Sequence, residues 1–76
     1  MDINVDKLIT TCDTIARRCT RIADTGHGSA WLFDKLMRAF EASPACVSIT
    51  IPVYVNLVGE GNAEIGRDGS LIMRRA

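Results

Sequence analysis

The chain has 76 residues, which leaves room for one small domain and not for two separate hydrophobic cores. Hydrophobic residues make up 47% of it and charged residues 24%, a mixture too apolar for a disordered chain and too interrupted for a membrane-spanning segment. Nine Lys and Arg residues balance nine Asp and Glu residues, which excludes the net positive charge on which general binding to nucleic acids or anionic membranes relies.

A helix is predicted over about residues 5–24, because apolar side chains recur there at alternating steps of three and four. The members of this stripe are Val5, Leu8, Cys12, Ile15, Cys19 and Ile22. Asp2 or Asn4 can cap the start of the helix, and Gly26 follows as a stop signal.

A second helix is predicted over about residues 29–42, with Ser29 as its cap and Ser43-Pro44 as its end. Its apolar arc consists of Leu32, Phe33, Leu36, Met37 and Phe40. The short connection at Gly26-His27-Gly28 predicts that the two helices form an antiparallel αα-hairpin.

After the second helix the apolar period changes from that of a helix to that of a strand. Odd-numbered apolar residues alternate with the even positions over about residues 46–58, so the odd face of a strand is expected to meet the core. Residues 62–74 can form one long partner strand, folded back at 59–61 into a kinked hairpin. The alternative is a three-stranded meander with a second tight turn at 67–69, where Asp-Gly is itself a turn signal.

The long hairpin is the favoured topology, because it pairs Ile49 with Leu71 and lays Tyr54 over Gly66. It also sets Val53 against Arg67, so we expect a bulge or kink near Pro52. The predicted fold is therefore a single α+β domain over residues 1–76 in ααββ order. Its two layers are the αα-hairpin and the odd face of the β-hairpin.

The three cysteines and the single histidine are the candidates for metal or catalytic chemistry. Cys12, Cys19 and Cys46 with His27 match the ligand count of a zinc site. Cys12 and Cys19 on one helix would lie ~10 Å apart along its axis, too far to share a zinc ion. A small enzyme around His27 and Asp24 lacks an oriented third group. We therefore expect no enzyme, no metal and no cofactor, and cysteines buried as small apolar side chains.

Two surfaces are candidates for binding. Trp31 lies beside Lys35 and Arg38 on the predicted solvent side of the second helix, and Trp and Arg often dominate interface energetics. The alternative surface is a basic patch consisting of Arg17, Arg18, Arg21, Arg74 and Arg75. This patch lacks the interleaved aromatic side chains of a single-strand-binding site, so nucleic acid is the less favoured partner.

These observations favour a non-enzymatic module that binds a larger protein and acts as its inhibitor or regulator. Small chains of this kind are common in phages and mobile elements, where they often block host machinery such as a CRISPR-type defence complex. The acidic start of the chain has no apolar signal stretch, and the odd number of cysteines fits a reducing compartment, so we expect a cytoplasmic protein without membrane contact. A domain this small buries a limited core, so we expect a homodimer.

Overall fold

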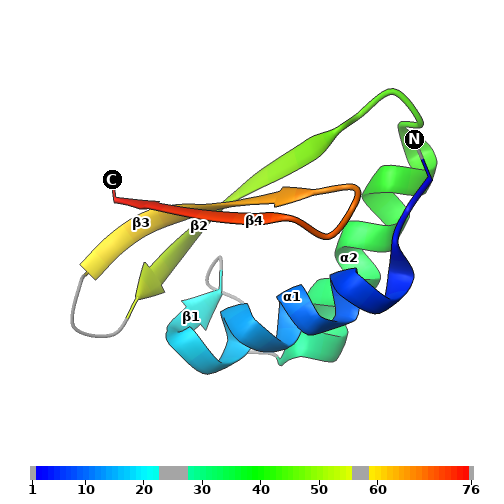
Figure 1. The fold of residues 1–76 in the computed structure, drawn as a ribbon. Helices are drawn as coiled ribbons and strands as arrows, with labels where there is room; N and C mark the ends of the chain where they lie inside the picture. The colour runs from blue at the N-terminus through cyan, green and yellow to red at the C-terminus, as the bar shows by residue number, and fades with distance from the viewer. Residues whose placement is uncertain (1, 23–27, 56–58, 76) are drawn as a thin grey trace.

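The computed structural model describes residues 2–22, 28–55 and 59–75. In chain order its elements are α1 (Val5–Arg18), β1 (Cys19–Ile22), α2 (Ser29–Ala42), β2 (Ser48–Val55), β3 (Gly59–Gly66) and β4 (Leu71–Arg75). The described strands form one antiparallel sheet in the order β1-β2-β3-β4, and both helices lie on one side of it (Figure 1). The expected two-layer α+β class in ααββ order is confirmed.

The first helix begins as predicted and ends earlier than predicted. The side chain of Asn4 accepts a hydrogen bond from the Lys7 N–H at 3.1 Å and so caps α1. The prediction of a helix to residue 24 is wrong, because Cys19 is already extended and opens β1. The spacing of Cys19 and Ile22 suits a helical stripe, but pairing with β2 satisfies the backbone groups of this segment and covers part of an open sheet edge.

The second helix spans the predicted residues 29–42, but its cap differs from the prediction. Gly28 occupies the N-cap position and has no side chain with which to cap the helix. Ser29, the predicted cap, is already the first helical residue. The Ser43 N–H donates to the carbonyl oxygen of Ala39 at 3.1 Å and closes the helix before Pro44. Because β1 lies between the helices in the chain, the expected simple αα-hairpin is corrected to two packed helices with an intervening strand.

The strands after α2 form the meander, and the long kinked hairpin is wrong. β2 pairs with β3 from Ser48 opposite Gly66 to Val55 opposite Gly59, without a shift at Pro52. The predicted strand over residues 62–74 is divided between β3 and β4.

The tight turn between β3 and β4 explains why the meander forms. Gly69 has a φ of +88°, and the Asp68 side chain accepts a hydrogen bond from the Ser70 N–H at 3.0 Å. The Gly69 N–H donates to the carbonyl oxygen of Gly66 at 2.9 Å. These local bonds reverse the chain before it could continue along β2.

The core lies between the helices and the odd-numbered face of the sheet, which confirms the predicted face from Ile49 to Val55. The prediction is wrong for Val47, which precedes β2 and is exposed. The buried apolar members of the core are Leu8, Cys12, Ile15, Cys19, Leu32, Leu36, Phe40, Val53, Ala63 and Ile65. The flanking side chains Ile49, Ile51, Val55, Leu71 and Met73 are partly buried against this cluster. Neither described helix has the length and apolar run that a membrane crossing requires.

Candidate protein-binding surface

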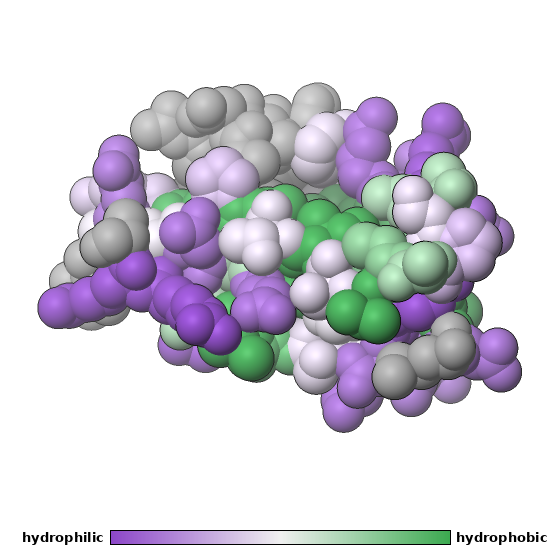
Figure 2. Space-filling model, turned by 90° about the horizontal axis from the view of Figure 1, so that it is seen from above, coloured by the Kyte–Doolittle hydropathy of each residue, from purple (hydrophilic) through white to green (hydrophobic). Residues whose placement is uncertain are grey.

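No element of residues 2–22, 28–55 and 59–75 covers the face of the sheet opposite the helices, and we call this face the outer face. Figure 2 looks onto this side of the molecule and shows apolar surface across its middle, with polar surface at the margins. Three large apolar side chains on this side are exposed, namely Val47 (66%) just before β2, Tyr54 (43%) on β2 and Ile72 (47%) on β4. Large apolar side chains gathered on one side of a small protein are typical of an interaction surface.

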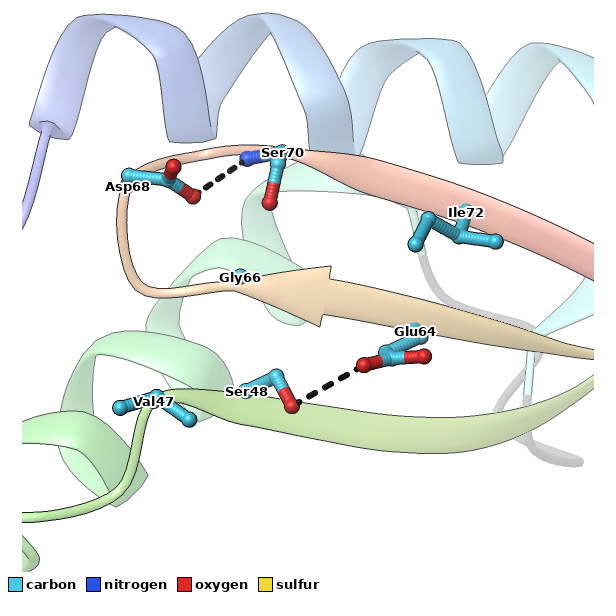
Figure 3. Close-up of a pocket in the computed structure, with 7 residues that line it drawn as sticks. All are labelled: Val47, Ser48, Glu64, Gly66, Asp68, Ser70 and Ile72. Atoms are coloured by element: carbon cyan, nitrogen blue, oxygen red, sulfur yellow. Dashed lines mark hydrogen bonds between the residues drawn. The ribbon is translucent and has the colours of Figure 1, made fainter.

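A shallow hollow of about 230 Å³ lies on the outer face, and we call it the Gly66 hollow (Figure 3). It is lined by Val47, Ser48, Glu64, Gly66, Asp68, Ser70 and Ile72. Gly66 keeps the hollow open, because a Cβ atom at that position would collide with the Ser70 hydroxyl and the Asp68 carboxylate. The hollow combines an apolar rim from Val47 and Ile72 with two acidic side chains.

The acidic groups of the hollow are held by hydrogen bonds. Glu64 accepts from the Ser48 hydroxyl at 3.3 Å and from Arg74 at 3.2 Å. The backbone N–H and the hydroxyl of Ser70 hold the pKa of the Asp68 carboxyl below its usual value, with a smaller effect from the positive charge of Lys7. An ionised carboxylate beside apolar groups suits a cationic or hydrogen-bond-donating side chain of another protein.

The free edge of β4 borders this hollow. In the described part of the chain β4 has a neighbour only on the β3 side. The Gly66 N–H donates to the carbonyl oxygen of Ser70 at 2.8 Å, so Ser70 directs its carbonyl group toward β3. Alternation along an antiparallel ladder then turns the backbone groups of Leu71, Met73 and Arg75 to the free edge.

The structure brings together only part of the predicted surface on α2. Trp31 is half-buried and packs against the core, so it does not project fully into solvent as its helical position predicts. The Lys35 ammonium lies 5.5 Å from the centre of the Trp31 ring. Arg38 instead forms an ion pair with Asp34 at 3.1 Å. The three residues share one helix side, with Trp31 serving also as packing.

The arginines of the alternative patch come from two distant parts of the chain and are partly gathered. Arg18, Arg74 and Arg75 line a second hollow, of about 180 Å³, together with Glu60. Arg17 is exposed near the end of α1, and the side chain of Arg21 lies outside the described residues.

Arg67 is a buried residue whose role the sequence analysis missed. It is 8% exposed, and its Nη1 atom donates to the carbonyl oxygens of Phe40 (3.0 Å), Ser43 (3.4 Å) and Cys46 (3.2 Å). A positive donor at the end of α2 satisfies carbonyl groups that a helix leaves without partners and complements its dipole. The signal was available, because the strand alternation places Arg67 at a core-facing position.

The same turn also contacts α1. Thr11 is buried, and its hydroxyl donates to the carbonyl oxygen of Gly69. A Cβ atom at Gly69 would lie 2.9 Å from the backbone carbonyl carbon of Lys7, so only glycine permits this close approach. The turn between β3 and β4 is therefore fixed to both helices.

The cysteines are placed as packing residues. Cys12 and Cys19 are buried and Cys46 is half-buried, and all three are free thiols. Burial, with a smaller contribution from the Asp13 charge, raises the pKa of Cys12 from 9.0 to about 11. Burial also raises the pKa of Cys19, against an opposing effect of the Arg18 charge. At neutral pH both thiols are protonated, which makes them poor nucleophiles and poor metal ligands.

The remaining candidates for metal or catalytic chemistry concern the segment between β1 and α2. His27 and Asp24 lie outside the described residues. Within residues 2–22, 28–55 and 59–75, no group of three or more His, Cys, Asp or Glu side chains is arranged to hold a metal ion.

Comparison with known proteins adds no family to this description. No protein-family model matches the chain, and the comparisons with curated proteins and with solved structures found no match.

Proposed function

We propose that this chain is a non-enzymatic module that binds a larger protein through the outer face of its sheet and thereby inhibits or regulates that protein. The observation that carries the proposal is the exposure of Val47, Tyr54 and Ile72 on a face that no described element covers. Burying such side chains against a partner removes apolar surface from water. This contributes a favourable free energy of about 25 cal/mol per Å² of buried apolar surface.

The Gly66 hollow indicates the chemistry of that partner. Its apolar rim and its Asp68 carboxylate favour a protein surface that presents an apolar side chain next to a lysine or arginine. Occupying such a surface is sufficient for inhibition when the partner uses it to bind its own substrate or subunit.

The proposal is tested by capture of the partner with the tagged full-length chain, identification by mass spectrometry, and affinity measurement on the purified pair. Val47→Asp and Tyr54→Ala alter the outer face, and each should weaken binding at least about tenfold with little change in melting temperature. Val5→Asp is the matched control, because Val5 is also exposed (43%) but lies on α1. Unchanged affinity in both outer-face variants would contradict the proposal.

Trp31→Ala tests the surface on α2 in the same assay. Because Trp31 packs against the core, we expect this variant to lower the melting temperature and to bind the partner normally once folded. A stable Trp31→Ala protein that fails to bind would move the interface to Trp31, Lys35 and Arg38.

A nucleic-acid-binding regulator is the second candidate, favoured by the three arginines that line one hollow. Binding through Arg18, Arg74 and Arg75 would neutralise phosphates, so it would weaken steeply with salt. The test measures the affinity of wild type, Arg18→Gln and Arg75→Gln for single-stranded and duplex DNA and RNA. The salt concentration is varied between about 50 and about 200 mM to obtain the slope of affinity against salt. Absence of salt-dependent binding would eliminate this candidate.

A further inference from the structure

The free edge of β4 lacks two of the features that usually keep sheet edges apart, a bulge and a proline, and its charges are confined to Arg74 and Arg75 at its end. Its pairing with β3 is regular from Leu71 to Arg75, without a bulge, and the strand contains no proline. Leu71 and Met73 point to the core side and Ile72 to the outer face, so the first part of the edge is apolar. An edge of this kind readily accepts another strand. By contrast, β1 at the opposite edge spans only Cys19–Ile22 and carries a register shift.

We infer that two copies of this chain pair through β4, antiparallel, about a two-fold axis that passes between the two Ile72 residues. The two four-stranded sheets then become one eight-stranded sheet, with both outer faces on the same side. In this register Leu71 of each copy lies opposite Met73 of the other. Both residues direct their backbone groups to the free edge, so the two chains exchange backbone hydrogen bonds at these pairs.

The charges near the two ends of β4 favour this register, and they favour a second copy of the chain as the strand that pairs with β4. The pairing places Arg74 of each copy opposite Ser70 of the other, on the outer face. Ser70 lies beside Asp68 and lines the Gly66 hollow. Each copy therefore contributes a guanidinium group to the acidic hollow of the other, where Asp68 is ionised.

Arg74 can serve both copies at once. Within its own chain it already contacts Glu64 at 3.2 Å, and its side chain remains 62% exposed. A guanidinium has five donors in a rigid fork, so it can hold Glu64 of its own chain and Asp68 of the second copy together. A single copy already places its own Arg74 against Glu64, so what the second copy adds to the hollow is a guanidinium group for Asp68.

The dimer and the larger partner proposed above both use the Gly66 hollow, so they compete for it. The dimer is tested on the purified chain alone, so the outcome of this test can be told apart from that of partner capture. Sedimentation equilibrium of the full-length chain should give twice the chain mass of 8.3 kDa at high concentration. Ile72→Lys puts two like charges opposite each other across the axis and should raise the dimer dissociation constant at least about tenfold. Ile9→Lys is the matched control, since Ile9 on α1 is exposed to a similar extent (44% against 47% for Ile72), and it should dimerise as wild type.

Cysteine cross-linking tests the register. Two Ile72→Cys residues at a non-hydrogen-bonded antiparallel pair would have Cα atoms ~4.5 Å apart, within the range of a disulfide. Mild oxidation should therefore link the Ile72→Cys variant into a covalent dimer and leave the Thr50→Cys and Met73→Cys variants unlinked. Cross-linking of Met73→Cys in place of Ile72→Cys would overturn the register. A monomer at all concentrations, or equal dimerisation of Ile72→Lys and wild type, would overturn the dimer.

Discussion

The two ends of the sheet are held in different ways. At the turn between β3 and β4, Arg67 and Gly69 connect the sheet to α2 and α1 through buried polar contacts. At the opposite end, Gly59 and Gly61 carry no side chains, and a hollow opens between the strands and Arg18 at the end of α1. Buried side-chain hydrogen bonds therefore fix the orientation of the helices at the turn end, while the other end is held by the pairing of β1 with β2 and by apolar side chains such as Cys19 and Met73. The difference predicts where substitutions are most damaging.

The largest expected effect concerns Phe40, which is fully buried at the turn end beneath the Arg67 guanidinium. Phe40→Ala should lower the free energy of unfolding by about 3–5 kcal/mol, because it leaves a cavity in the core. Met73→Ala, at the Gly59 end of the sheet, should lower the free energy of unfolding by less, since Met73 is only partly buried. Urea denaturation of both variants checks this, and equal losses would remove the distinction between the two ends.

Removal of the buried arginine should be nearly as damaging. Arg67→Met keeps much of the side-chain volume but leaves the carbonyl groups of Phe40, Ser43 and Cys46 without their charged donor. We expect a loss of about 3 kcal/mol. Arg74→Met is the control at an exposed position, where an ion pair contributes about 0–1 kcal/mol. Similar stabilities of the two variants would show that Arg67 is not a structural contact.

The middle of α1 should respond to pH through Cys12. Its pKa is raised to about 11 in the folded chain from 9.0, so the stabilising effect is complete below pH 9 and is lost as the pH rises toward 11. The rise corresponds to up to about 3 kcal/mol. Denaturation between pH 8 and 11 should show this decline in wild type and a smaller one in Cys12→Ala. Parallel curves for the two proteins would contradict the assignment.

The smallest expected difference in stability is between alanine substitutions at two glycines, one at each end of the sheet. Gly59 and Gly69 both have positive φ, +95° and +88°, so alanine should cost about 1 kcal/mol at each for the backbone alone. At Gly69 the added Cβ also collides with Lys7, whereas at Gly59 it meets nothing within 4 Å. Thermal melts should therefore show Gly69→Ala to be the less stable by at least about 1 kcal/mol. Equal losses would mean that α1 yields at this contact.

Much of the fold could be predicted from periodicity alone. The apolar arc of α2 and the odd face of β2 are where the alternation places them, because burial of these side chains dominates the packing. The step of three between Cys19 and Ile22 could not distinguish a helix from a strand, and pairing with β2 decided it. The choice between hairpin and meander depended on the Asp68-Gly69 turn, whose local hydrogen bonds outweighed the cross-strand matching of apolar residues.

The candidate surface was harder to predict than the fold. Sequence reasoning selected Trp31 because a helical wheel places it away from the apolar arc, yet a large ring near a core can still pack sideways against it. The outer face depends on which side of the sheet the helices cover, a tertiary property. Tyr54 and Ile72 at even positions were the available signal, since the core occupies the odd face. Arg67 was overlooked because its three acceptors come from a segment more than twenty residues away.

The most direct test of the claim that this chain works through the outer face of its sheet is an NMR titration of the labelled full-length chain with its captured, purified partner. The side-chain signals of Val47 and Tyr54 should shift or broaden at substoichiometric partner, while the Trp31 indole signal should keep its position. Shifts confined to Trp31, Lys35 and Arg38, with the outer-face signals unchanged, would contradict the claim.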